Sequence, residues 1–539
     1  MSKYKHIVAV ILAVIMAMSL CMGASATAPV YETVEQVPLS VGKTGALYAT
    51  TDEQGNAYGP SDYSISDNGM YMLNTANNTV FQYRDNKQAA KITLDSFDII
   101  GTALAVNDDS EILVLDNNLT ISKIENGKQE FIGTARKAMD IDNAVDFKAS
   151  GQYVYVSEPT PEGGKTHRFL VDSSTGKLTL DQTIDGYMVD DNTFYRTSIE
   201  TKNNENSGHK CTIYILNTSG SVTDTITLYS TNYIAGAQYL GKNADNKHVV
   251  KQIDMACYAD GTCDVEETIR TIDPDDTVIA CAPVESVAPS MCDPVTVEDG
   301  KVYQFDLTID GATIAEMKTE NMGTADKFSS KLKESNMSTT SFRDNTGIET
   351  QALTSISRTA VMNDAKAYHS SFTWSCSSKN LAALSNWTRP RYVTGAGTYS
   401  YMPYCWGGFS TTAQYKTGMS NSGRVGNINT STPGHVANTY GLDCSGYVSR
   451  CWRQSTKYGT GTIGSICNSI AYNQLKPADA LNKSGSHIVL YEYADGAGNY
   501  VLFEATTLNK YDKVSHTNRP IASLSSGGYV ALRYKGITG

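Results

Sequence analysis

The chain has 539 residues and a formal net charge of −12, from 44 lysines and arginines against 56 aspartates and glutamates. Because a single hydrophobic core stops growing beyond about 250 to 300 residues, this length excludes one ordinary domain, and we expect two large units. The acidic balance argues against nucleic acid as a partner, since binding to phosphates needs a basic surface.

The first 26 residues have the pattern of a secretory leader. Lys3 and Lys5 give a positive start, an apolar stretch covers 7–18, and Ala24-Ser25-Ala26 forms a small-residue cleavage site. A membrane-spanning helix needs about 20 apolar residues, and this stretch is shorter. We predict that residues 1–26 are a signal peptide and that the mature protein has no transmembrane segment. It would be secreted, extracellular or associated with the cell wall.

Residues 29–317 contain short alternating apolar runs between turns rich in Asp, Asn and Gly, which is typical of β-strands. A pair of such runs joined by a tight polar turn recurs at intervals of 41 to 54 residues. The turns fall near Asn68, Asp109, Ser150, Asp191, Asp245 and Asp299. Because a four-stranded propeller blade repeats every 40 to 50 residues or so, we predict an all-β propeller-like domain of about six blades. An irregular pair of β-sandwiches remains the alternative.

The propeller-like region carries no pattern that demands a metal. Turn chemistry accounts for acidic residues such as Asp109 and Asp191 more simply than calcium does. The spacing of Cys257 and Cys263 does not match common zinc ligands. We therefore predict no metal and no cofactor, and we expect a glycan or protein as the ligand of the propeller.

Residues 318–349 are rich in Ser, Thr, Asn, Lys and Glu and poor in large apolar residues. This composition is typical of an inter-domain connector. A helical pattern follows over 355–369. We therefore place the second domain at 350–539.

The segment GLDCSGYVSRCWR, residues 441–453, is the most informative part of the second domain. A turn precedes Cys444, and a helical pattern follows it. Unpaired amides and the helix dipole at a helix start favour an anion, so this position favours the reactive thiolate. A main-chain amide near Cys444 could also stabilise an oxyanion.

A cysteine nucleophile needs a base, and His487 is the best candidate because it opens the apolar strand-like run SHIVLYEY. The next predicted strand, NYVLFEAT, places Glu504 where a carboxylate could orient the imidazole ring. His435 and His516 are rival bases, but both lie in loop-like contexts rich in Ser, Thr, Pro and Asn.

Four segments occur in a specific order: PYCWGG at 403–408, DCSGYV at 443–448, LKPADAL at 475–481 and SHIVLYEY at 486–493. Together they resemble the NlpC-type family of bacterial cell-wall cysteine peptidases, and the resemblance covers about 350–539. It implies an α+β papain-like domain. It also implies hydrolysis of amide bonds in peptidoglycan stem peptides, often between γ-D-glutamate and a diamino acid, without a cofactor.

The resemblance also implies roles for individual residues. Cys444 would be the nucleophile, His487 the general base and later acid, and Glu504 the third catalytic residue, where the family frequently has histidine. Glutamate is a departure that remains suitable, because a carboxylate can fix the imidazole tautomer and stabilise its charged form.

Family members that cut short stem peptides with a free amino end share the Tyr-x-Trp-Gly-Gly segment and the Asp before cysteine. By this resemblance, Tyr404, Trp406, Asp443 and Ser445 would bind the substrate, with Asp443 pairing with its ammonium. The structural alternatives are that Trp406 belongs to the core and that Asp443 is a helix cap.

Two further departures concern the surroundings of the motifs. Thirty-four residues separate Gly408 from Asp443, and this insertion would form either a flap over the site or an idle surface loop. Alanine stands at Ala478, where glycine is usual in the family.

The prediction is a secreted cysteine peptidase acting on peptidoglycan stem peptides. Two other functions remain open. One is a cell-surface binding protein with a propeller ligand site and an inactive peptidase domain. The other is a thiol acyltransferase.

Overall fold

The computed structural model describes residues 43–46, 49–51, 57–66, 68–85, 87–94, 100–172, 175–200, 210–284, 293–308, 311–318, 330, 332 and 353–539. The predicted signal peptide lies outside the described residues. So does the predicted connector 318–349, apart from Lys318, Ser330 and Leu332.

The described part of the N-terminal region folds into six consecutive antiparallel sheets, in each of which the strand order follows the chain. A short pair, β1 (Thr50–Thr51) and β2 (Ala57–Tyr58), precedes them. The first sheet comprises β3 (Pro60–Ser66), β4 (Gly69–Asn74), β5 (Thr79–Arg84) and β6 (Lys87–Thr93), and the second β7 (Gly101–Val106), β8 (Ile112–Asp116), β9 (Thr120–Glu125) and β10 (Lys128–Thr134). The third comprises β11 (Asp146–Ser150), β12 (Tyr153–Glu158), β13 (Lys165–Asp172) and β14 (Lys177–Asp185), and the fourth β15 (Tyr187–Met188), β16 (Phe194–Ile199), β17 (Lys210–Leu216) and β18 (Val222–Tyr229). The fifth comprises β19 (Tyr233–Lys242), β20 (His248–Cys257), β21 (Cys263–Ile272) and β22 (Val278–Pro283), and the sixth β23 (Val295–Glu298), β24 (Lys301–Thr308) and β25 (Gly311–Met317).

The six turns predicted from the sequence all join the first and second strands of these sheets. Several residues at these turns suit the positive φ angle that a tight turn needs. The angle φ is positive at Gly151, Asn246 and Asp299, with values of 52°, 59° and 48°. Gly and Asn enter this region at low cost, and Asp does so more easily than most residues.

The six sheets form a closed ring, as a propeller requires. Neighbouring sheets touch mainly through their first strands: β3 contacts β7, β7 contacts β11, β11 contacts β15, and β19 contacts β23. Between the fourth and fifth sheets, β19 contacts β16, the second strand of the fourth sheet. The ring closes where Phe305 of the last sheet packs with Phe81 of the first. The Tyr63 hydroxyl also donates to the carbonyl oxygen of Pro294 at 3.1 Å. The chain is thus mostly β, and the predicted propeller is confirmed.

Residues 353–539 form a mixed region around a six-stranded sheet of order β31-β36-β32-β33-β34-β35. Its strands are β31 (Cys467–Ser469), β32 (Ala480–Lys483), β33 (His487–Ala494), β34 (Asn499–Thr506), β35 (Lys513–Pro520) and β36 (Val530–Tyr534). Its α-helices are α2 (Arg358–Ala367), α3 (Thr412–Ser420), α4 (Cys444–Cys451) and α5 (Ile521–Ser526). The short strands pair as β26 (Ile356–Ser357) with β37 (Ile537–Thr538), β27 (Thr373–Cys376) with β28 (Gly397–Ser400), and β29 (Arg424–Val425) with β30 (Thr439–Tyr440). Four 3-10 turns complete it: η2 (Ser378–Leu381), η3 (Ile463–Ile466), η4 (Tyr472–Gln474) and η5 (Leu508–Lys510).

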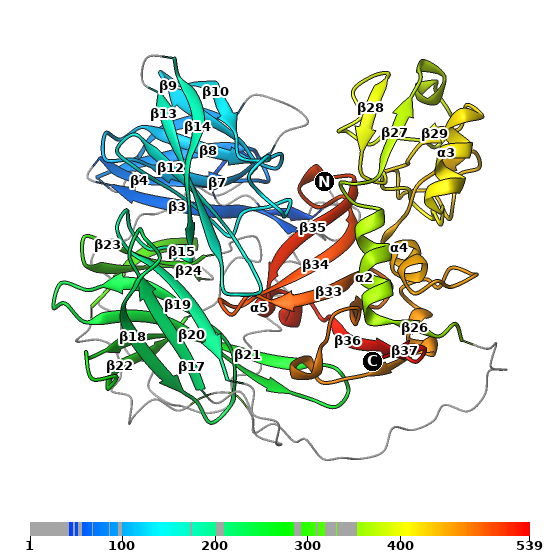
Figure 1. Cartoon of the computed structure of the whole chain (residues 1–539). Helices are drawn as coiled ribbons and strands as arrows, with labels where there is room; N and C mark the ends of the chain where they lie inside the picture. The colour runs from blue at the N-terminus through cyan, green and yellow to red at the C-terminus, as the bar shows by residue number, and fades with distance from the viewer. Residues whose placement is uncertain are drawn as a thin grey trace.

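Both faces of this sheet are covered, by different partners. On one face, Leu490 and Phe503 pack against Val448 of α4. On the other, Val489 and Leu502 pack with residues of the fifth propeller sheet such as Ile253. Figure 1 shows the sheet between the propeller and the helices α2 and α4. Burial on both faces explains why β34 reads as the nearly continuous apolar run NYVLFEAT.

The hairpin between β33 and β34 reaches into the propeller. Ala497 bridges to Gly236 of β19, and the Ala237 amide donates to the Gly496 carbonyl at 2.9 Å. A Cβ atom on Gly236 would lie 2.3 Å from the Gly498 nitrogen. Glycine at Gly236 therefore permits the two backbones to approach this closely.

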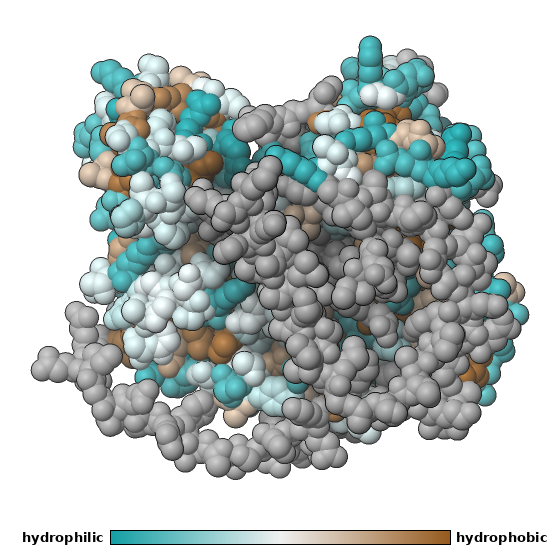
Figure 2. Space-filling model, turned by 180° about the vertical axis from the view of Figure 1, so that it is seen from behind, coloured by the Kyte–Doolittle hydropathy of each residue, from teal (hydrophilic) through white to brown (hydrophobic). Residues whose placement is uncertain are grey.

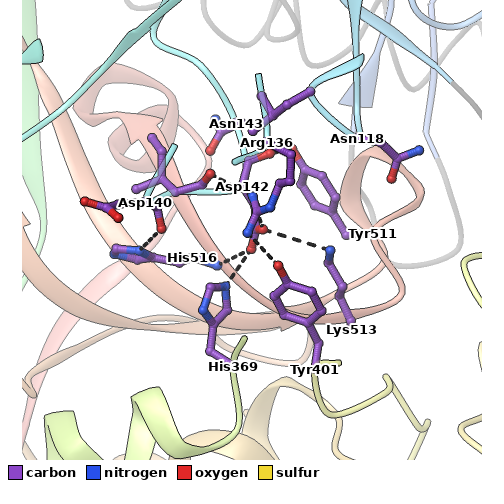
Figure 3. Close-up of polar contacts among 12 residues, drawn as sticks. Asn118, Arg136, Asp140, Asp142, Asn143, His369, Tyr401, Tyr511, Lys513 and His516 are labelled. Carbon is purple, nitrogen blue, oxygen red and sulfur yellow. Dashed lines mark hydrogen bonds and ion pairs between the residues drawn. The ribbon is translucent and has the colours of Figure 1, made fainter. Parts of the chain in front are cut away.

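A second contact centres on Asp142, which lies in the segment between β10 and β11. Its carboxylate is almost completely buried and receives the Arg136 guanidinium at 2.6 Å, His369 Nε2 at 2.9 Å and the His516 amide at 2.8 Å (Figure 3). Lys513 Nζ lies 3.9 Å away. Burial alone would raise the pKa of Asp142, but Lys513, His369 and Arg136 hold it far below its usual range.

The opposite face of the molecule from that in Figure 1 has a mainly polar surface where residues are coloured, with apolar residues in small separate patches (Figure 2). Among the described residues, no helix is long and apolar enough to cross a membrane.

Candidate active site

Helix α4 begins at Cys444 because the preceding residue caps it. Asp443 has an extended backbone, and its Oδ1 accepts a hydrogen bond from the Gly446 amide at 2.7 Å. An aspartate at this position satisfies one of the amides that a helix start leaves unpaired. The structure thus places Cys444 in the first turn of a helix, as the sequence predicted.

The helix packs closely against the segment that contains Trp406. A Cβ atom on Gly446 would lie 2.1 Å from the Gly408 carbonyl oxygen, so no larger residue fits there. Farther along the helix, Tyr447 and Val448 are fully buried against the sheet. These contacts fix Cys444 relative to β33 and β34, the two strands of that sheet that α4 contacts.

His487 is the first residue of β33, and Glu504 lies on the neighbouring strand β34. His487 Nε2 lies 2.8 Å from Glu504 Oε2. Both side chains are buried, with exposed fractions of 6% and 0%. Because Glu504 occupies Nε2, the nitrogen Nδ1 is the one left to face the sulfur.

Cys444 contacts the same histidine. Burial would lower the pKa of His487, but nearby Tyr529 and Cys444, with hydrogen bonds to Cys444 and Glu504, raise it well above its usual range. A charged imidazolium beside sulfur stabilises a thiolate. The structure therefore places Cys444 beside His487, which is in turn hydrogen-bonded to Glu504.

Glu504 is itself held by two residues of β35. Arg519 donates to both carboxylate oxygens, at 3.0 Å from Nε and 2.6 Å from Nη2, and the Thr517 hydroxyl donates at 2.7 Å. Burial alone would raise the pKa of Glu504, but Arg519, His487 and Thr517 lower it to about 2. Glu504 is thus ionised at neutral pH.

The sequence analysis missed Thr517 and Arg519. They stand two residues apart in β35, so they share one face of that strand. The register pairs Glu504 with Ser515 and Leu502 with Thr517. Thr517 and Arg519 therefore lie on the same face of the sheet as Glu504. Strand alternation could have indicated them, but only once β35 was known to lie beside β34.

The residues predicted to bind substrate are all near the start of α4. Tyr404 is 1% exposed and lies in the core. Trp406 is half-buried, and its Nε1 donates to the Thr432 carbonyl at 2.9 Å. The Ser445 hydroxyl donates to Asp443 Oδ1 at 3.2 Å.

Asp443 has two further partners beyond the cap. Its Oδ2 accepts a hydrogen bond from the Gly407 amide at 3.0 Å and forms an ion pair with the Lys457 ammonium. Lys457 was not among the candidate residues, because a single lysine in a loop of the sequence gives no signal. The ammonium that pairs with Asp443 in this structure belongs to the chain itself.

The rival histidines lie elsewhere. His516 Nε2 pairs with Glu492 at 2.7 Å, within the contact between the propeller and the sheet. His435 Nε2 contacts the Thr439 carbonyl at 2.9 Å, within the insertion. Of the three histidines, His487 is the one that lies beside Cys444.

The insertion at 409–442 is a packed part of the domain rather than an idle loop. It contains α3, and the Arg450 guanidinium of α4 stacks on the Phe409 ring at 3.4 Å. The loop 432–435 covers Trp406 and Gly407, because a Cβ atom on Gly407 would lie 2.6 Å from the His435 nitrogen. The insertion therefore forms one wall beside the start of α4.

The other cysteines differ from Cys444 in their surroundings. Nine cysteines within the described ranges are free thiols. Burial raises the pKa of Cys405 to about 12, and it raises the pKa of Cys451 still further. These two thiols are protonated at neutral pH and unsuited to attack. The described residues contain no group of three His, Cys, Asp or Glu side chains arranged to hold a metal ion.

No model of a protein family matches the chain, and no curated protein matches it. Solved structures do. Virginiamycin B lyase from Staphylococcus aureus is 11% identical, and the match covers 53% of this chain and 98% of that one with a TM-score of 0.31. BamB from Moraxella catarrhalis is 14% identical over 54% of this chain and 100% of that one, with a TM-score of 0.28. The WD40 β-propeller domain of Doa1 is 11% identical over 52% and 99%, with a TM-score of 0.29.

Likenesses this distant carry no argument about what the chain binds or does. The propeller rests instead on the sheet order and on the contacts that close the ring. The chemistry of residues 353–539 rests on the geometry around Cys444.

Proposed function

We propose that the chain is a secreted cysteine peptidase with a papain-like α+β domain that hydrolyses amide bonds in bacterial peptidoglycan stem peptides. The observation that carries this proposal is the buried line from Cys444 through His487 to Glu504. Such a line supplies a nucleophile, a base within reach and a group that orients the base. No cofactor is needed for this chemistry.

In the first half of the reaction, the Cys444 thiolate attacks the carbonyl carbon of the substrate amide. An unpaired amide in the first turn of α4 stabilises the oxyanion that forms. His487 then gives its proton to the leaving nitrogen, the C–N bond breaks, and an amine departs. A thioester on Cys444 remains.

In the second half, His487 takes a proton from water, and the resulting hydroxide attacks the thioester. The C–S bond breaks, the acid product leaves, and the sulfur returns as the thiolate beside imidazolium. Glu504, ionised throughout, stabilises the imidazolium in each half.

The substrate class rests on the resemblance to NlpC-type peptidases, which the order of the four sequence segments supports. Within that class we expect cleavage at γ-D-glutamyl-diamino acid bonds. The propeller covers one face of the sheet that carries His487 and Glu504, so its first role is to complete the fold of the catalytic domain. Binding of a glycan or protein by the propeller remains a prediction.

The test is a digest of purified peptidoglycan and of synthetic stem peptides, with products identified by mass spectrometry. We expect cleavage by the wild type, none by Cys444→Ala, and a loss of at least about 100-fold in kcat/KM for Glu504→Gln. Cys376→Ala is the matched control, because this cysteine of the same domain is as buried as Cys444 but lies in β27 and not at the start of α4.

The two alternative functions give different results in the same experiment. Binding of peptides without turnover by the wild type would favour an inactive peptidase domain. Formation of a new amide with an added amine would favour an acyltransferase. Activity that survives Cys444→Ala would refute the proposed mechanism.

A further inference from the structure

The carboxylate of Asp443 has no acceptor position left for a substrate. Oδ1 accepts from the Gly446 amide at 2.7 Å and the Ser445 hydroxyl at 3.2 Å. Oδ2 accepts from the Gly407 amide at 3.0 Å and from the Lys457 ammonium. A carboxylate offers about four lone-pair positions, and these donors fill them. Its side chain is 6% exposed, so solvent offers no easy exchange of partners.

A substrate ammonium could therefore reach Asp443 only by displacing Lys457. We propose that Lys457 permanently takes the place of a substrate amine, so that this peptidase acts on stem peptides whose amino end is acylated. Such an end is present while a stem peptide is still joined to its glycan strand. The inference rests on the proposed function and specifies the substrate for it.

The chemistry of Lys457 distinguishes the two kinds of amino end. Its side chain is 23% exposed, so the ammonium lies between the buried carboxylate and the surface. One of its three N–H groups serves Asp443, which leaves donors for a carbonyl oxygen. An acylated amino end presents such an oxygen and no charge. A free amino end presents only donors and a positive charge, which the lysine repels.

The surroundings hold Lys457 beside the nucleophile. Asp443 immediately precedes Cys444, and Gly407 belongs to the segment that the insertion covers. The lysine follows α4 closely in the chain, and the adjacent Tyr458 amide donates a hydrogen bond to the Ser449 hydroxyl oxygen at 3.2 Å. Its ammonium therefore lies at the end of α4 where the substrate carbonyl must arrive.

The test compares two tripeptides, L-Ala-γ-D-Glu-L-Lys with a free amino end and the same peptide N-acetylated. We expect the wild type to have a kcat/KM about tenfold higher for the acetylated peptide. Lys457→Met keeps the aliphatic stem without the charge, and it should remove this preference. Lys457→Arg should retain it, and Lys476→Met, at an exposed position in the same domain, should behave as the wild type.

A second measurement needs no variant. The amine of the free peptide loses its proton near pH 8. If Lys457 repels that charge, the ratio of kcat/KM for the free peptide to that for the acetylated peptide should rise between about pH 6.5 and about pH 9. This range spans the pKa of the peptide amine, which is about 8. Titration of the enzyme itself affects both peptides and cancels in the ratio.

The outcomes separate the two proposals. A wild type that prefers the free amine, or a ratio that falls with rising pH, would overturn the role of Lys457 while leaving the peptidase intact. Cleavage of neither peptide, with the chain folded, would remove the proposed function and this inference with it.

Discussion

The propeller and the C-terminal sheet bury their apolar faces in different ways. In the described propeller, every sheet is built from strands that follow one another in the chain, and each sheet packs on others of the same kind. In the C-terminal sheet, β36 lies between β31 and β32, and the two faces meet unlike partners. A ring of repeats can close on itself, but this sheet depends on a second unit.

The difference changes how the propeller is understood. Tyr491 and Leu502 on one face of the sheet pack with the fifth propeller sheet, while Phe503 on the other packs toward α4. The strands that carry His487 and Glu504 therefore share a core with the propeller. A propeller attached only as a targeting module would not bury this face.

The strongest test is to express residues 353–539 alone. Removal of the propeller exposes Val489, Tyr491, Tyr500 and Leu502 together, a contiguous apolar surface of the kind that drives aggregation. We expect an insoluble or molten fragment, seen as loss of near-ultraviolet circular dichroism and of a cooperative thermal transition. Co-expression of residues 43–318 as a separate chain should restore solubility. A soluble fragment with a single sharp transition would show that the sheet does not need the propeller.

The next largest effect should come from the polar contact between the two regions. Asp142→Asn leaves the Arg136 guanidinium and the Lys513 ammonium near a neutral group in a buried site. Breaking a buried ion pair by removing one partner typically costs 3 to 5 kcal/mol, so we expect a loss of about 3 kcal/mol in the free energy of unfolding. Urea denaturation measures it.

Asp140→Asn is the matched control for this substitution, because Asp140 is exposed and lies two residues away. It should change the free energy of unfolding by less than about 0.5 kcal/mol. Equal effects of the two substitutions would mean that the cluster around Asp142 does not join the regions.

The same cluster should make stability depend on pH. Burial, with His516 and Lys513, lowers the pKa of His369 despite the opposing effect of Asp142. The unfolded chain then binds a proton more readily than the fold does, so this group takes stability away as pH falls below about 6.5. The lowered pKa of Asp142 acts in the same direction at lower pH. We expect His369→Gln to lose less stability than the wild type between about pH 7.5 and about pH 5.5, a range that spans the pKa of about 6.5 of histidine in the unfolded chain. Denaturation curves at each pH measure the free energy of unfolding. Parallel curves for the two proteins would contradict this.

Sequence reasoning reached the propeller and the residues around the nucleophile for different reasons. The turns near Asn68 and Asp299 recur with a period, and a period needs no knowledge of distant contacts. Cys444 and His487 were found through their local contexts, a helix start and a strand start. Both signals are local, so both could be obtained from the chain itself.

Long-range partners could not be obtained in this way. Arg519 and Lys457 act through the residues they pair with, Glu504 and Asp443, and nothing in their own neighbourhoods indicates those partners. The insertion of the hairpin tip at Ala497 into the propeller was equally invisible, because its glycines read as an ordinary turn. Pairing across hundreds of residues is a property of the fold.

The smallest predicted effect concerns the backbone at Ala478 in the second region. In the propeller turns Asn246 and Asp299 occupy positive φ, but Ala478 adopts φ of 78° with a side chain that does not favour it. A left-handed backbone costs a non-glycine residue about 1 to 2 kcal/mol, whereas loss of one buried methyl group costs about 0.8 kcal/mol. Ala478→Gly should therefore raise the free energy of unfolding slightly, by less than about 1 kcal/mol. Ala480→Gly is the control, since Ala480 is equally buried but lies in β32, and it should lower stability by about 1 kcal/mol or more. If thermal denaturation shows the same loss for both substitutions, the backbone at Ala478 is not strained.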